Sequence, residues 1–160
     1  MWRVLVLLGC LPMMVQAEVY FAEVTHVSDG DTLWVKPEGV ATPRKLRLLG
    51  LDAPEICQSG GVAARDALTA LVENVRVRVS VKYQDTYERG LARISVNGED
   101  VGARLVASGH AWSSRWHHNQ GPYAKQEAQA RNQHLGLFAQ TQVEMPRDFR
   151  KRFGSCYSAK

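Results

Sequence analysis

The sequence predicts an α+β domain in which five short strands form a Greek-key β-barrel and three α-helices pack around it. Segments of alternating β-branched and aromatic residues recur between turn dipeptides, which indicates short, half-buried strands. A single segment with helical apolar spacing stands between the third and fourth of these strands, and two more follow the last strand. Together these observations match the arrangement of an OB-fold.

Five segments have the composition and alternation of strands. They are Val19 to Ser28, Thr32 to Val35, Lys45 to Leu51, Val75 to Val81 and Gly90 to Val96. Turn signals separate them, namely Asp-Gly-Asp at 29–31, Pro-Glu-Gly at 37–39 and Asn-Gly at 97–98. Pro54 ends the third strand, because proline cannot donate to a strand ladder.

Three segments are predicted as helices: Val62 to Val72, Val101 to Ala107 and Tyr123 to Gln133. Gly136 follows the last of them as a C-terminal cap. The sequence contains no repeat, low-complexity stretch or linker, so residues 18–140 are expected to form one domain. Residues 141–160 form a basic tail that we expect to pack loosely.

Residues 1–17 have the pattern of a signal peptide, so we expect the protein to be secreted or periplasmic. Its small size and the lack of an obvious exposed heptad lead us to expect a monomer. Arg3 precedes an apolar run, and Val15-Gln16-Ala17 offers the small residues that a signal peptidase accepts. The run is shorter than the roughly 20 residues that span a bilayer. Two alternatives are a lipoprotein box ending at Cys10 and a buried N-terminal strand, although the polar start at Glu18 argues against the strand.

Signal-peptide removal leaves two cysteines, Cys57 and Cys156. An even pair in an oxidising compartment predicts a disulfide, which would tether the tail to the loop after residues 52–55. The alternative is two free thiols, if their Cα atoms lie more than about 7 Å apart.

The charge balance is only mildly basic. Lys and Arg together number 20 and Asp and Glu 16, giving +4. This excess permits a polyanionic partner without requiring one.

Four short segments, at 29–32, 47–52, 54–55 and 87–91, hold the residues that could carry chemistry. Three of them contribute carboxylates at strand ends or turns, and hard oxygen ligands of this kind suit Ca²⁺. Zinc is not predicted, because no Cys/His pair has zinc spacing and His117-His118 lacks a third partner. Arg47 lies five residues before Asp52, so a regular strand would place them on opposite faces unless the chain bends near Gly50.

If these segments converge, each residue has a chemical role. Asp31 and Asp52 would hold the metal ion, and Glu55 would act as general base on a water molecule. Arg47 and Arg89 would clamp phosphate oxygens with their planar guanidinium groups. Taken singly, each residue also fits an ordinary turn, loop or solvated strand face, so the hypothesis depends on their joint appearance and order.

That order resembles the staphylococcal nuclease (thermonuclease) family. The matching segments are Asp-Gly-Asp-Thr at 29–32, Arg-Leu-Leu at 47–49 leading to Asp52, Pro54-Glu55, and Tyr87 followed by Arg-Gly-Leu-Ala at 89–92. Residues 103–109, 127–131 and 135–138 are similar to the family's later helices.

The resemblance implies an OB-fold with three helices, a Ca²⁺ site, and attack of water on phosphorus in DNA or RNA that yields 3′-phosphorylated products. It implies a metal site built from Asp31, Asp52 and the Ala53 carbonyl, with Glu55 as the base. It also implies phosphate contacts from Arg47 and Arg89, and a nucleotide pocket lined by Tyr87, Trp112 and Trp116. Trp112 has the alternative role of filling the core.

The chain departs from the family pattern at three places: Ala53 replaces threonine, Glu88 stands where glycine is common, and the loop after Glu55 is short. Two other functions remain open. One is a catalytically silent nucleic-acid-binding module, which should have lost Glu55 or an arginine. The other is a secreted structural or inhibitor domain, which predicts no thermal shift with Ca²⁺.

Overall fold

A computed structural model describes residues 18–115 and 117–156, so the predicted signal peptide lies outside the described part. The strands are β1 (Glu18–Val27), β2 (Thr32–Pro37), β3 (Arg44–Leu48), β4 (Leu51–Asp52), β5 (Arg76–Gln84), β6 (Gly90–Val96), β7 (Glu99–Asp100) and β8 (Trp112–Ser113). The helices are α1 (Gly61–Val72), α2 (Val101–Ala107), α3 (Ala124–Asn132), the 3-10 helix η1 (Gly136–Ala139) and α4 (Pro146–Phe153).

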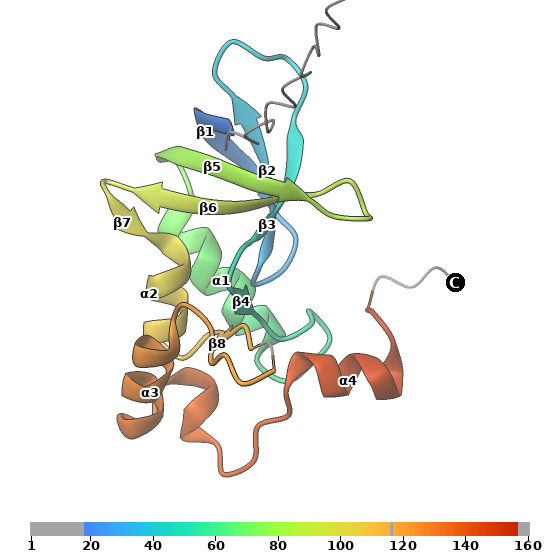
Figure 1. Ribbon diagram of the computed structural model, residues 1–160, viewed down its shortest axis with the longest axis vertical. Helices are drawn as coiled ribbons and strands as arrows, with labels where there is room; N and C mark the ends of the chain where they lie inside the picture. Colours follow the sequence, from blue (N-terminus) through green and yellow to red (C-terminus); the bar gives the residue numbers. More distant parts are fainter. Residues whose placement is uncertain (1–17, 116, 157–160) are drawn as a thin grey trace, which may run out of the picture.

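The predicted five-stranded barrel is confirmed. Its antiparallel strands follow the order β3-β2-β1-β5-β6, and β3 pairs with β6 in parallel, which closes the barrel. The short strand β7 pairs with β6 after the Asn97-Gly98 turn, as the sequence predicts for that dipeptide. In Figure 1 the barrel forms one half of the molecule, and the helices lie together in the other half.

Side chains that alternate along the strands point inward and form the hydrophobic core of the barrel. The inward-facing side chains of β2 and β5, among them Leu33, Val35, Val77 and Val79, are fully buried. Helix α1 closes one end of the barrel with Leu68 and Val72, also fully buried. The helical spacing predicted for this segment is therefore the spacing of its core-facing stripe.

A second, smaller cluster lies among the later helices. Trp112 packs edge-on against Phe138, with ring centroids 5.9 Å apart, and Ala130 and Leu137 complete the cluster. The N-terminus of α2 is capped by Asp100, whose side chain accepts from the Ala103 amide at 3.0 Å.

The structure corrects the predicted number of α-helices from three to four, because α4 forms inside the segment expected to pack loosely. Pro146 opens the helix, and three basic residues in its last turn favour its C-terminal end. Pro146, Phe149 and Phe153 recur at helical spacing, a short signal that the expectation of a loosely packed basic tail overlooked. In Figure 1, α4 lies on the opposite side of the lower half from α3.

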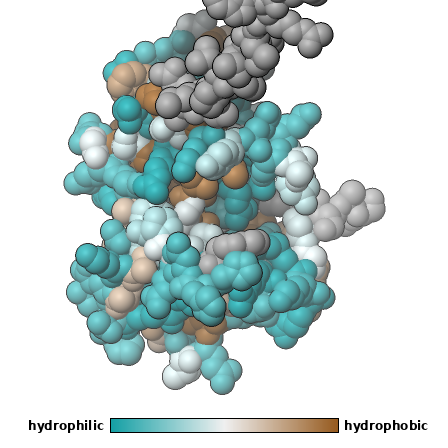
Figure 2. Space-filling view, viewed as in Figure 1, coloured by the Kyte–Doolittle hydropathy of each residue, from teal (hydrophilic) through white to brown (hydrophobic). Residues whose placement is uncertain are grey.

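None of the helices described in residues 18–156 is long and apolar enough to cross a membrane. The face of the molecule in Figure 2 is mainly hydrophilic, with apolar atoms showing only in small patches between polar ones.

Candidate active site

The Asp-Gly-Asp turn between β1 and β2 places Asp31 in the interior, next to the start of α1. A Cβ on Gly30 would lie 2.6 Å from that of Ala64 and 2.8 Å from that of Ala53, so only glycine allows this close approach. The carboxylate of Asp31 is held by the Thr32 hydroxyl, which donates to its Oδ1 at 2.9 Å.

Arg47 and Asp52 lie on the same side of the chain. Strand β3 ends at Leu48 and β4 begins at Leu51, and Gly50 between them adopts φ +89°, in the left-handed region. The resulting bend brings Asp52 Oδ1 to 3.1 Å from Arg47 Nη2. The pairing of Thr32 with Arg47 between β2 and β3 places Asp31 Oδ2 2.7 Å from the same nitrogen. The convergence that required a bend near Gly50 is therefore present.

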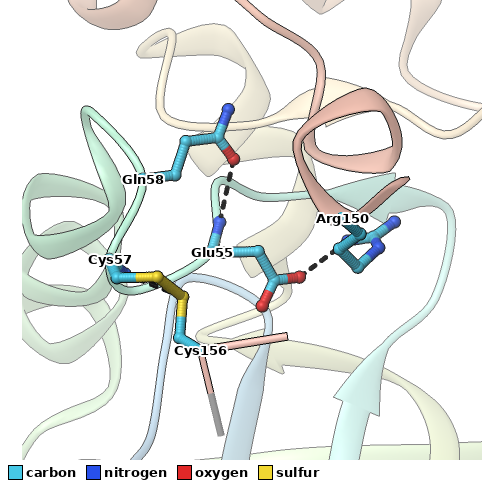
Figure 3. The surroundings of a disulfide bond; sticks show 5 residues. All are labelled: Glu55, Cys57, Gln58, Arg150 and Cys156. Atoms are coloured by element: carbon cyan, nitrogen blue, oxygen red, sulfur yellow. Dashed lines mark hydrogen bonds and ion pairs between the residues drawn. A yellow bond between two sulfur atoms is a disulfide. The ribbon is translucent and has the colours of Figure 1, made fainter. Parts of the chain in front are cut away.

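Glu55 follows Pro54 in the loop that leads to α1. Its amide donates to Gln58 Oε1 at 3.2 Å, which folds the loop back on itself. Only 13% of its side chain is exposed, and its Oε1 lies 2.8 Å from Arg150 Nη1 (Figure 3).

Arg89 is held by the hairpin between β5 and β6. Asp85 Oδ2 accepts from its Nε at 2.8 Å, while Asp85 Oδ1 accepts from the amides of Tyr87 and Arg89. Burial raises the pKa of Asp85, but the hydrogen bonds from Arg89 and Tyr87 outweigh it and lower that pKa overall. Tyr87 itself is 77% exposed.

The backbone of Glu88 adopts φ +60°, in the left-handed region, which residues other than glycine rarely adopt. This conformation accounts for the glycine that is common at the position. Glu88 does not line the cleft of Arg47 and Arg89, but a neighbouring groove that also contains Tyr83.

These side chains meet in one cleft of about 660 Å³. The residues that line it are Asp29, Asp31, Lys45, Arg47, Pro54, Glu55, Tyr87, Arg89, Arg150 and Ser155. The predicted catalytic residues Arg47, Glu55 and Arg89 therefore line the same cleft. The predicted metal ligand Asp31 and Tyr87 line it as well. Both acidic and basic groups line that cleft, which suits a phosphodiester and a cation together.

The residue that sequence reasoning missed is Arg150, from α4. Its Nη1 contacts Glu55, and both terminal nitrogens lie 3.4 Å from carboxylate oxygens of Asp52. The predicted pair of cysteines brings it there: Cys57 and Cys156 form a disulfide, with Cα atoms 5.9 Å apart. The only features of the sequence that could have pointed to Arg150 at the cleft were this cysteine pair and the basic composition of the tail.

Crowded carboxylates give the cleft an affinity for positive charge. Burial, followed by the nearby Asp31 charge, raises the pKa of Asp29 to about 6. Burial also raises the pKa of Asp52, with Asp31 adding to that effect and Arg150 and Arg47 opposing it. Desolvated carboxylates of this kind are stabilised by a divalent cation, so the residues present fit one.

The protein ligands for such a cation are few. In the described parts of the chain, no group of three or more His, Cys, Asp or Glu side chains is arranged to hold a metal ion. Asp31 and Asp52 offer two carboxylates, and the carbonyl of buried Ala53 is the adjacent backbone oxygen. Water would complete the coordination, which Ca²⁺ readily accepts.

The prediction that Trp112 lines a nucleotide pocket is wrong. Trp112 is 1% exposed and packs against Phe138, so it fills the core. The other aromatic residue of that prediction, Trp116, lies outside the described residues.

Replacing Asp29 by asparagine should stabilise the protein at pH 8 in chelator. The folded protein keeps the Asp29 proton up to about pH 6, whereas an unfolded aspartate loses it near its ordinary pKa of 3.8. Stability therefore falls as the pH rises from about 4 to about 6, by up to about 3 kcal/mol. The amide oxygen of asparagine still accepts from the Asp31 amide.

Thermal unfolding of both proteins at pH 3.5 and pH 8 measures this difference. The variant should gain stability at pH 8 and lack that gain at pH 3.5. An equal gain at both pH values would contradict the role of the Asp29 charge.

Similarity to known proteins places this site in a family. Residues 45–140 match the family described as staphylococcal nuclease homologue. A probable staphylococcal-like nuclease, CAN4, of Oryza sativa subsp. japonica is 33% identical over 114 residues, which cover 71% of this chain and 23% of that protein. Most of the rice protein thus has no counterpart in this chain.

Two bacterial relatives are matched over more of their length. An uncharacterized endonuclease of Haemophilus influenzae is 30% identical over 129 residues, covering 81% of this chain and 72% of that protein. Protein ParB of Escherichia coli is 33% identical over 140 residues, covering 81% and 78% respectively. The chain belongs to the staphylococcal nuclease family.

Proposed function

We propose that this protein is a Ca²⁺-dependent endonuclease that hydrolyses phosphodiester bonds of DNA and RNA. The observation that carries the proposal is the shared cleft, which Glu55 lines together with Arg47, Arg89 and the buried Asp31. Asp52 does not line the cleft itself but contacts Arg47 at its edge. The nuclease relatives support the same reaction class at the level of the family.

The chain's own residues have separate roles in substrate binding and in proton transfer. Arg47 and Arg89 donate hydrogen bonds to phosphate oxygens, and these bonds strengthen as charge accumulates in the transition state. Glu55 accepts a proton from a water molecule aimed at phosphorus. Asp31 and Asp52 are the residues that would hold Ca²⁺, which would supply Lewis-acid chemistry at a phosphoryl oxygen.

The bonds made and broken fix the products. The water oxygen bonds to phosphorus as Glu55 takes one of its protons, the bond from phosphorus to the 5′-oxygen breaks, and that oxygen takes up a proton from solvent. The phosphate stays on the 3′ side, so we expect 3′-phosphorylated fragments. Tyr87, exposed at the mouth of the cleft, is suited to contact the nucleotide.

The predicted signal peptide supports a site of action in the periplasm or outside the cell. The small size of the domain leads us to expect a monomer. The disulfide between Cys57 and Cys156 supports an oxidising compartment.

A second candidate is a catalytically silent module that only binds nucleic acid. The ion pair between Arg150 and Glu55 favours it, because a base held by a guanidinium is less available to a water molecule.

One experiment tests the proposed function. The chain from Glu18 onward is incubated with single-stranded DNA, double-stranded DNA and RNA, in Ca²⁺ and in chelator. We expect fragments with 3′-phosphate ends in Ca²⁺ and none in chelator. Binding without cleavage in saturating Ca²⁺ would select the silent module instead.

A further inference from the structure

We propose that Arg150 is a third phosphate-binding arginine of the cleft, supplied by residues 141–156, which we call the C-terminal arm. Its ligand is the phosphodiester backbone of the nucleic-acid strand. The inference rests on the proposed function, because it concerns how the same cleft holds its substrate.

Two neighbouring residues fasten the C-terminal arm on either side of α4. Before the helix, Gln58 Nε2 donates to the Glu144 carbonyl at 2.8 Å. After the helix, Cys156 is bonded to Cys57. Figure 3 shows Cys57, Gln58 and Glu55 on one loop facing the arm. The loop that carries Glu55 therefore also sets the position of Arg150.

Arg150 is held in the same way as the other two arginines. A protein carboxylate holds each of them at the edge of the cleft: Asp31 holds Arg47, Asp85 holds Arg89 and Glu55 holds Arg150. The Arg150 side chain keeps 34% of its surface exposed and lines the cleft. A guanidinium has five N–H donors, so its contacts with carboxylates leave donors for a phosphate.

The other basic side chains of α4 do not share this position. Arg147 is 60% exposed and pairs with Asp148 on its own helix, as does Lys151. Arg152 pairs with Glu144 within the arm. Only Arg150, of the four basic residues of α4, lines the cleft. Its placement is thus specific and does not follow from the general charge of the tail.

The opposite role is also testable. A guanidinium that pairs with Glu55 could block the cleft, in which case removing it would strengthen substrate binding. Phosphate binding predicts weaker binding on removal, so the two roles give effects of opposite sign.

The test is fluorescence anisotropy of a labelled single-stranded DNA oligonucleotide in chelator, where no cleavage is expected. For Arg150→Ala we expect Kd to rise about tenfold or more, because a charge-assisted contact is lost. The slope of log Kd against log salt should fall by about 0.7, the value for one phosphate contact on a single strand. Arg150→Lys should recover part of the affinity.

Arg147→Ala is the matched control, since it removes the same charge from the same helix away from the cleft. It should leave Kd within about twofold, as expected for an exposed charge. Melting temperatures confirm that each variant is folded.

Unchanged or tighter binding by Arg150→Ala, with wild-type binding intact, would overturn this inference and leave the nuclease proposal standing. Wild-type protein that binds no nucleic acid, in chelator or in Ca²⁺, would overturn both.

Discussion

Substitution of Glu55 by glutamine should lower kcat for DNA hydrolysis about 1,000-fold, within the range that a general base contributes. Glu55 lines the cleft beside Arg47 and Arg89 but is not one of the two carboxylates adjacent to the expected cation. An amide of the same shape cannot accept the proton of the attacking water, so the chemical step loses its base. KM should change little, because Arg47 and Arg89 still hold the phosphate.

The fold should survive this substitution. Glutamine retains an oxygen that can accept from Arg150 Nη1, which contacts Glu55 Oε1 at 2.8 Å. The Glu55 amide, which donates to Gln58, is unaffected by a change in the side chain. The melting temperature in chelator should therefore stay within a few degrees of the wild-type value.

Initial rates on a fluorogenic oligonucleotide in saturating Ca²⁺ provide the measurement. Asp29→Asn is the matched control, since it makes the same carboxylate-to-amide change in the same cleft. If Asp29→Asn were the variant with the large loss and Glu55→Gln stayed within a few-fold of wild type, Glu55 would not be the base.

The barrel was predictable because each strand shows its buried face in the alternation of its own neighbouring residues. A strand with one buried face must alternate, and the strict alternation of β5 survives in the structure as the buried Val77 and Val79. Strands β4 and β8 were not predictable, because each has two residues and two residues carry no period. Their pairing depends on the bend at Gly50, which the sequence allowed without requiring.

The site was predictable only through the order of its residues. Spacing placed Arg47 and Asp52 on opposite faces unless the chain bent, and the bend reversed that expectation. Trp112 was assigned to the nucleotide pocket because a buried and a stacking tryptophan look alike in a sequence. Arg150 could not be assigned, because its partner Glu55 lies 95 residues away and the sequence of α4 does not show which part of the fold the helix meets.

Removing the disulfide, through Cys57→Ser/Cys156→Ser, should lower the free energy of unfolding more than any of the other proposed substitutions. The crosslink joins residues 99 positions apart, so the loop that it closes contains α1, α2, α3, α4 and the strands from β5 onward. Constraining an unfolded loop of this size is worth about 4.7 kcal/mol. For a domain of this size that loss corresponds to a fall in melting temperature of roughly 10 °C or more.

The full effect requires the C-terminal arm to stay docked when the disulfide is absent. Its remaining attachments include the bond from Gln58 to the Glu144 carbonyl and the pairing of Arg150 with Glu55 and Asp52. If these attachments fail, the arm undocks while the barrel stays folded. The undocked arm gains conformational entropy in the native state, so the net loss of stability is smaller.

Melting temperature and limited trypsin digestion together separate these cases. A large fall in melting temperature with an arm that resists cleavage at Arg147 and Lys151 means that the crosslink acts on the unfolded chain. An unchanged melting temperature with rapid cleavage there would show that the arm folds apart from the barrel. In that case the disulfide would serve to hold Arg150 at the cleft and contribute little to the stability of the domain.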